Sequence, residues 1–130
     1  MMKGIKDLKT LLASMKPELS DNSYVFCTVD GELNDYLSLK PLATFVESEG
    51  LTLVLEQSQA DRSGITYDGV YRCITLTVHS SLEAVGLTAA VSTQLATFGI
   101  SANVVAAYYH DHIFVQQSKA QEAMKALAEI

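Results

Sequence analysis

The chain contains no tryptophan, only two cysteines and only two prolines among its 130 residues. It also lacks any apolar run of about 18 residues, the length that a membrane-spanning helix needs. Cys27 and Cys73 lie in separate apolar segments without C-x-x-C spacing, so the sequence predicts neither a disulfide framework nor a zinc site. We expect both thiols to be small buried residues of the core.

Positive charge is also scarce. Nine lysines and arginines stand against fifteen aspartates and glutamates, which gives a formal net charge of −6. A field of that sign repels phosphate backbones, so we expect no nucleic-acid partner. Lys6, Asp7 and Lys9 interrupt the apolar pattern near the N-terminus, which a secretory signal peptide does not tolerate. We therefore expect a cytoplasmic protein that does not insert into a membrane.

The motifs of the common catalytic sites are missing. The sequence has no G-x-S-x-G, no P-loop and no cysteine paired with an evident base. His110, Asp111 and His112 offer two possible metal ligands but no further partner, and we interpret them as a polar turn. We therefore expect no enzyme activity, no metal and no cofactor.

What the sequence does contain is regular apolar patterning, with 48% hydrophobic residues to build a core. In the first half, apolar spacings of three and four predict a helix that begins near Ile5 and ends at Pro17. A strand over 24–29, a helix over 38–50 and a strand over 51–57 should follow, and then a polar segment with a short helical turn. The stripe of the second helix is Leu39, Leu42 and Val46.

In the second half, an Asp68-Gly69 hairpin signal precedes a long alternating strand. A helix that ends at Gly99 follows, then two strands that meet at His110-Asp111, then a helix opened by a capping box of Ser118 with Gln121. The residues expected to face the core are Ile74, Leu76, Val78, Leu87, Val91, Leu95, Phe98, Ala120, Ala123, Met124 and Leu127.

The two halves look like copies of one unit. Thr28-Val29 precedes Asp30 as Thr77-Val78 precedes His79, an offset of 49 residues. Gly50 and Gly99 have the same offset, at positions that we interpret as equivalent helix ends. The sequence thus predicts an α+β protein of two units, over 1–66 and 67–130.

The segment TLTVHSSLEAVGLTAAVSTQLATFGISANVVAAYYHDHIFVQQSKAQEAMKAL resembles the ACT domain. The likeness covers about 70–127 well, and the first half only through the internal repeat. It implies two ferredoxin-like βαββαβ units packed side by side, with antiparallel sheets and helices on one face. It also implies a regulatory or sensing module that binds an amino acid or a similar small molecule, without catalytic activity.

The loop from Ser80 to Gly86 is the best candidate for a binding site. A helix that begins near Ser81 or Glu83 presents unpaired N–H groups and a positive dipole end, which suit a carboxylate. Gly86 lacks a Cβ and permits close approach of a ligand. The alternative is that Ser80 and Glu83 form a capping box, which would satisfy the same donors internally.

Polar residues of the next strand extend this candidate site. Ser101 and Asn103 alternate with apolar neighbours, so they share a sheet face that is either solvated or turned toward another unit. The corresponding loop of the first half, from Asp30 to Leu37, either forms a second site or has lost it. The expected ligand-binding residues are Ser80, Ser81, Glu83, Gly86, Leu87, Ser101, Asn103 and Asp30.

A second interpretation is a structural or protein-interaction module whose pocket is closed by side chains. In either case an outer strand edge or an apolar helix face is left over, and we expect it to be covered in a homodimer.

Overall fold

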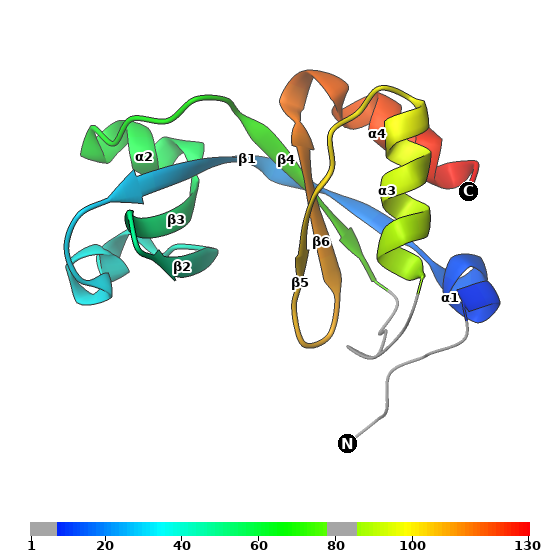
Figure 1. Ribbon diagram of the computed structural model, residues 1–130. Helices are drawn as coiled ribbons and strands as arrows, with labels where there is room; N and C mark the ends of the chain where they lie inside the picture. The colour runs from blue at the N-terminus through cyan, green and yellow to red at the C-terminus, as the bar shows by residue number, and fades with distance from the viewer. Residues whose placement is uncertain (1–7, 78–85) are drawn as a thin grey trace. The chain divides into compact units, whose positions relative to one another are not determined.

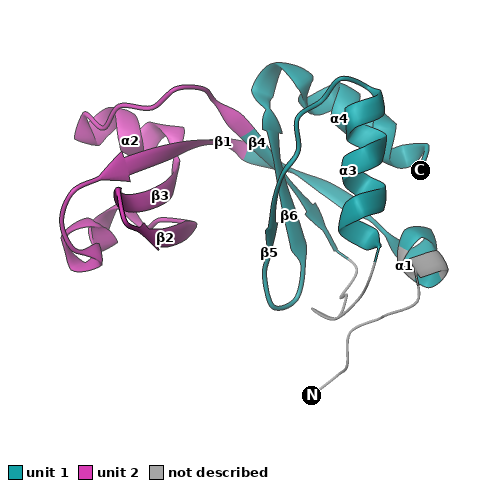
Figure 2. Ribbon diagram, viewed as in Figure 1, with its two compact units in different colours: residues 1–21, 72–130 teal, residues 22–71 magenta. Residues whose placement is uncertain are grey.

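The computed structural model describes residues 8–77 and 86–130 (Figure 1). Their contacts form two compact units, one made of 22–71 and the other of the residues up to Asp21 together with those from Arg72 on (Figure 2). The division falls inside strand β1 (Pro17–Val29). The boundaries of the two units therefore differ from the predicted 1–66 and 67–130. The reason is that residues 17–21 of β1 are hydrogen-bonded to the later half of the chain. The backbone N–H of Cys73 donates to Oγ of Ser20 at 3.1 Å.

The unit 22–71 holds three strands, a 3-10 helix and a short α-helix. The first strand is the later part of β1, and it is followed by η1 (Leu33–Leu39), β2 (Ala43–Glu47), β3 (Gly50–Glu56) and α2 (Gln57–Ser63). Its strand order is β2-β3-β1, and both pairs are antiparallel. The buried core comprises Val25, Cys27, Leu51, Leu53 and Leu55 from one sheet face together with Ala60 of α2.

The other unit has the strand order β1-β4-β6-β5. Its elements are α1 (Leu8–Ser14), β4 (Tyr71–Leu76), α3 (Leu87–Thr97), β5 (Asn103–Ala106), β6 (Asp111–Gln116), η2 (Gln117–Lys119) and α4 (Ala120–Ala128). The helices bury their apolar stripes against one sheet face, as alternation along the strands requires. The fully or nearly fully buried core comprises Ile74, Leu76, Leu87, Val91, Leu95, Ile100, Ile113, Val115, Ala120, Ala123, Ala126 and Leu127.

The duplicated α+β architecture is confirmed, because the two units repeat the same order of elements. Strand, helical segment, two strands and helix follow one another twice, and the strand order β2-β3-β1 corresponds to β5-β6-β4. The register agrees as well. Thr44 pairs with Leu53, and Val104 pairs with Ile113, so both partners recur at an offset of 60 residues.

The predicted helix over 38–50 is wrong. The residues form the end of η1 and then strand β2, with Lys40 between them in the left-handed conformation at φ 51°. Thr44, Phe45 and Val46 are β-branched or aromatic and favour a strand, and Pro41 cannot donate within a helix. The apolar spacing of this segment was compatible with a helix but did not decide between the two structures.

The equivalence of Gly50 and Gly99 is therefore wrong too. Gly50 opens β3 after a tight turn, whereas Gly99 follows the end of α3 with φ 74°. The offset of 49 holds for the first strand of each unit. It grows to 60 because α3 and its connections take more residues than η1 does.

Most other predicted elements are present. The strand at 24–29, the short helical turn in α2 and the strands on either side of 107–110 are confirmed, and the strand predicted over 51–57 ends one residue earlier, at Glu56. In α3, Leu87, Val91 and Leu95 are buried as predicted, whereas Phe98, which we expected in the core, is 39% exposed because it lies at the C-terminal end of the helix. Strand β1 begins earlier, at Pro17. Two local predictions are wrong: no side chain caps the start of α4, where η2 comes first, and Asp68-Gly69 joins α2 to β4 rather than two strands. Val78 lies outside the described residues.

Both cysteines are buried and free, as predicted. Burial raises the pKa of each thiol above its usual value, which keeps both protonated and unreactive.

Candidate functional site

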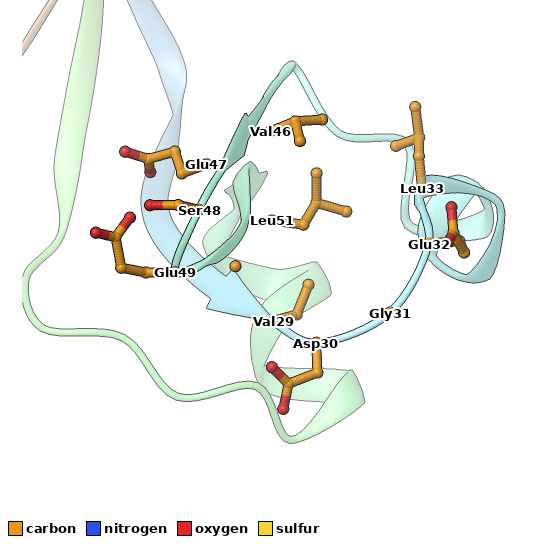
Figure 3. Close-up of a pocket in the computed structure, with 11 residues that line it drawn as sticks. Val29, Asp30, Gly31, Glu32, Leu33, Val46, Glu47, Ser48, Glu49 and Leu51 are labelled. Carbon is orange, nitrogen blue, oxygen red and sulfur yellow. The ribbon is translucent and has the colours of Figure 1, made fainter.

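A cavity of about 400 Å³ lies at the end of β1 in the unit 22–71 (Figure 3). Two chain segments line it: the loop that leaves β1, and the turn between β2 and β3. The lining residues are Val29, Asp30, Gly31, Glu32 and Leu33 from the first segment, and Val46, Glu47, Ser48, Glu49, Gly50 and Leu51 from the second.

The loop after β1 is held by local hydrogen bonds. The backbone N–H of Glu32 donates to Oδ2 of Asp35 at 3.1 Å, and the hydroxyl of Tyr36 donates to the carbonyl oxygen of Asp30. Gly31 has φ 107°, and a Cβ at this position would lie 3.0 Å from Oδ2 of Asp35. Glycine is therefore required for the chain to turn here and form one wall of the cavity.

Apolar side chains face the hollow of the cavity. Val29, Val46 and Leu51 point into the space between the two segments, whereas the carboxylates of Asp30, Glu47 and Glu49 point away from it (Figure 3). The Thr52 hydroxyl donates to Oε1 of Glu47 at 2.5 Å. The floor of the cavity thus suits an apolar group, and burial of such a group there is favourable.

The charge around the cavity is of one sign. Among the described residues, its lining includes the exposed carboxylates of Asp30, Glu32, Glu47 and Glu49 and no lysine, arginine or histidine. A cationic group at the rim is therefore attracted and a free carboxylate is repelled.

Of the predicted binding residues, Asp30 lines this cavity. Ser80, Ser81 and Glu83 lie outside the described residues. Gly86 directly precedes α3 and has φ 102°, a conformation that side-chain-bearing residues rarely adopt. Leu87 is buried in the core, and its predicted role in binding stays a prediction.

Ser101 and Asn103 are exposed, as expected, but they do not lie near Gly86 within their unit. They follow the C-terminal end of α3, whereas Gly86 precedes its N-terminal end. The eleven residues of α3 span about 16 Å. Nδ2 of Asn103 donates to the carbonyl oxygen of Phe114 at 3.2 Å. A site that contains both ends stays a prediction, and it requires a residue set from a further unit or copy.

Sequence reasoning missed the second wall of the cavity, from Val46 to Leu51. The cause is the wrong helix over 38–50, which placed this turn inside a helical segment. The strand propensity of Thr44, Phe45 and Val46, followed by the Ser-Glu-Gly turn, was the signal that could have identified it.

A second group of polar side chains lies around the strand β6. Asp111 is buried, and desolvation raises the pKa of its carboxyl group, while the charges of His110 and His112 lower it.

Among residues 8–77 and 86–130, no group of three or more potential metal ligands comes together. In the same part of the chain, each helix is too short or too polar to span a bilayer.

Comparison with known proteins identifies the family to which this fold belongs. Two family models, both of the ACT domain, match residues 3–72 and 69–129. A crystal structure from Vibrio cholerae, of a protein of unknown function described as a possible transport protein, is 63% identical with a TM-score of 0.88 and 98% of each chain covered. No protein with a curated description matches the chain significantly.

More distant structures share the fold alone. A protein from Agrobacterium tumefaciens is 17% identical, with a TM-score of 0.71, over 88% of this chain and 87% of that one. The regulatory subunit of aspartate kinase from Thermus thermophilus, in its ligand-free form, is 6% identical, with a TM-score of 0.60, over 89% and 97% of the two chains. These likenesses confirm the tandem arrangement of ferredoxin-like units that the sequence predicted.

Proposed function

Because the chain belongs to the ACT domain family, we propose that it is a regulatory module that senses a small molecule without transforming it. The observation that carries this proposal is the cavity at the end of β1, formed by 29–33 and 46–51. It lies in the first unit at the loop that corresponds to the binding loop predicted in the second unit. The regulatory subunit of aspartate kinase, which has the same fold, supports a regulatory role.

The chemistry of the cavity narrows the ligand class. Val29 and Leu51 provide an apolar floor, Val46 adds an apolar side chain at the mouth, and the carboxylates at the rim attract a positive charge. An amino acid with an apolar side chain, or the corresponding amine, meets both conditions through its side chain and its ammonium group. The ligand carboxylate contributes less here, since the lining offers it backbone groups but no cationic side chain.

The predicted residues of the second unit form the second part of this proposal. Ser80, Ser81, Glu83 and Gly86 would hold a ligand at the start of the following helix, and Ser101 and Asn103 of another copy would complete that site. The proposal for the first unit does not depend on it, because Asp30 and the cavity belong to a separate unit.

A thermal-shift screen of the amino acids and their decarboxylated amines tests the proposal. A ligand at about a hundred times its dissociation constant stabilises the fold by roughly 2.7 kcal/mol, which raises the melting temperature of a domain of this size by several degrees. We expect apolar amines and apolar amino acids to give the largest shifts. If no member of the panel shifts the curve, the sensing function is wrong and the interaction module without a ligand takes its place.

A further inference from the structure

Strand β2 exposes apolar side chains on both of its faces. It stands at the end of the strand order β2-β3-β1, and an edge strand carries backbone N–H and C=O groups that the sheet leaves available. Leu42, Phe45 and Val46 are 52%, 69% and 81% exposed. Val46 pairs with core residue Leu51 and Phe45 pairs with Thr52, so the two side chains lie on opposite faces of the sheet.

The second unit shows that the fold does not require this surface. At the offset of 60 residues, Phe45 and Val46 of β2 correspond to Val105 and Ala106 of the other edge strand, β5, and Leu42, directly before β2, corresponds to Ala102, directly before β5. Val105 is only 37% exposed. The same position in the same fold thus carries smaller apolar residues, and the larger ones on β2 need a separate explanation.

The charge of the unit 22–71 indicates what the surface binds. This segment holds eight acidic and two basic residues, a net charge of −6, while the rest of the sequence is balanced. Glu47 and Glu49, both exposed, lie at the end of β2. A second copy docked on this strand would bring two such units together, which is unfavourable, whereas a basic partner is attracted.

The exposure on both faces indicates how the partner binds. A docked helix covers one face of an edge strand, whereas an added strand places side chains beside its neighbour on both faces. We propose that β2 is the docking edge for an extended segment of a basic partner protein. The segment pairs with the backbone of β2, contacts Leu42, Phe45 and Val46 with apolar residues, and sets lysine or arginine against Glu47 and Glu49.

This interaction surface goes beyond the proposed ligand site, and Phe45 separates the two experimentally. Phe45 is not among the residues that line the cavity, and its side chain lies on the sheet face away from the core. A change at Phe45 therefore affects the docking edge while the floor of the cavity stays intact.

The test uses the full chain and a synthetic peptide with alternating valine and threonine at its centre and two arginines at each end. NMR of the backbone amides reports where the peptide binds. We expect the amide resonances of 43–47 to shift and those of 103–106 to stay in place. Phe45→Lys should weaken binding by about tenfold or more, while the register-matched Val105→Lys in β5 leaves it unchanged.

Two further peptides separate the contributions to binding. Glutamates in place of the arginines should abolish binding at low salt, because the charge complementarity is reversed. A proline at the centre should also abolish it, because it removes a backbone donor of the added strand.

Three results would overturn the proposal: equal shifts at β5, equal binding of the glutamate peptide, or full binding by Phe45→Lys. A dimer in sedimentation that Phe45→Lys converts to a monomer would assign the edge to a second copy and would also overturn it. The proposed function is tested separately, by changes in the amide resonances of 29–33 when a small molecule is added.

Discussion

The hydroxyl oxygen of Thr75 lies 2.9 Å from Nδ1 of His112 and joins β4 to β6. Both residues alternate with core residues, Ile74 and Ile113, so the pair lies on the sheet face away from the core. Burial lowers the pKa of His112, and His110 lowers it further, while Asp111 opposes the change. The imidazole is therefore neutral in the folded chain near neutral pH.

A pH dependence of stability follows from this pair. Below about 6.5, the ordinary pKa of histidine, the unfolded chain binds a proton at His112 that the folded chain does not. The free energy of unfolding should therefore decrease as the pH falls from that value toward the lowered pKa of the folded state.

Urea unfolding at a series of pH values, with the chain and with His112→Asn, checks this expectation. In His112→Asn, the free energy of unfolding should decrease less as the pH falls than it does in the unchanged chain. Asp111 acts in the opposite direction at lower pH, because its raised pKa makes the folded chain bind a proton first. The difference between chain and variant reports His112 together with its effect on the pKa of Asp111. An identical pH slope for both proteins would contradict the assignment.

The internal repeat makes a prediction about packing. Ala60 and Ala120 stand 60 residues apart, at the helix that follows the central strand of each unit, and both are buried. Leucine at either position overpacks the core, which we expect to cost about 1–3 kcal/mol. Ser58 and Ser118, two residues earlier, are exposed, and leucine there should change stability little.

Denaturant unfolding of the four single variants tests this equivalence. A large cost for Ala60→Leu together with none for Ala120→Leu would mean that the two helices do not pack alike, and the offset of 60 would then be an accident of spacing.

The fold could be predicted from the sequence where patterns were long or chemically specific. The strand over 51–56 and the stripe of Leu87, Val91 and Leu95 were clear, because periodicity and burial agree there. The segment 38–50 failed, since its apolar spacing fits a helix while its β-branched and aromatic residues pair with β3 in the folded sheet. That pairing is a long-range effect which local spacing does not contain.

The same failure hid part of the candidate site. Asp30 was identified from the repeat, but the wall from Val46 to Leu51 depends on the register of β2 with β3. The compact units also depend on pairing across the chain, because Ser20 bonds to Cys73, 53 residues away. No local pattern in the sequence indicates that contact.

The proposed cavity leads to a prediction about Val46, which is 81% exposed at its mouth. Lysine at this position removes an apolar contact and repels an ammonium group, so Val46→Lys should abolish ligand-induced thermal stabilisation. The register-matched Ala106→Lys, at an exposed position of β5, should keep it. A full thermal shift in Val46→Lys would place the ligand elsewhere.

The homodimer was predicted to cover an outer strand edge or an apolar helix face, and the assignment of β2 to a basic partner leaves the other edge strand, β5, or a helix face for it. Light scattering should give about twice the chain mass of 14.1 kDa. Because β2 is assigned to a basic partner, Phe45→Lys should leave this mass unchanged. A monomeric mass at micromolar concentration would contradict the homodimer, and it would leave the ligand site untouched.

The most direct test of the central claim, that the chain senses an amine-bearing small molecule at the end of β1, is an amide NMR titration. The probe is the panel member that gives the largest thermal shift. We predict saturable changes in the resonances of 29–33 and 46–51, which line the cavity. The account is contradicted if every member of the panel leaves those resonances unmoved at millimolar concentration.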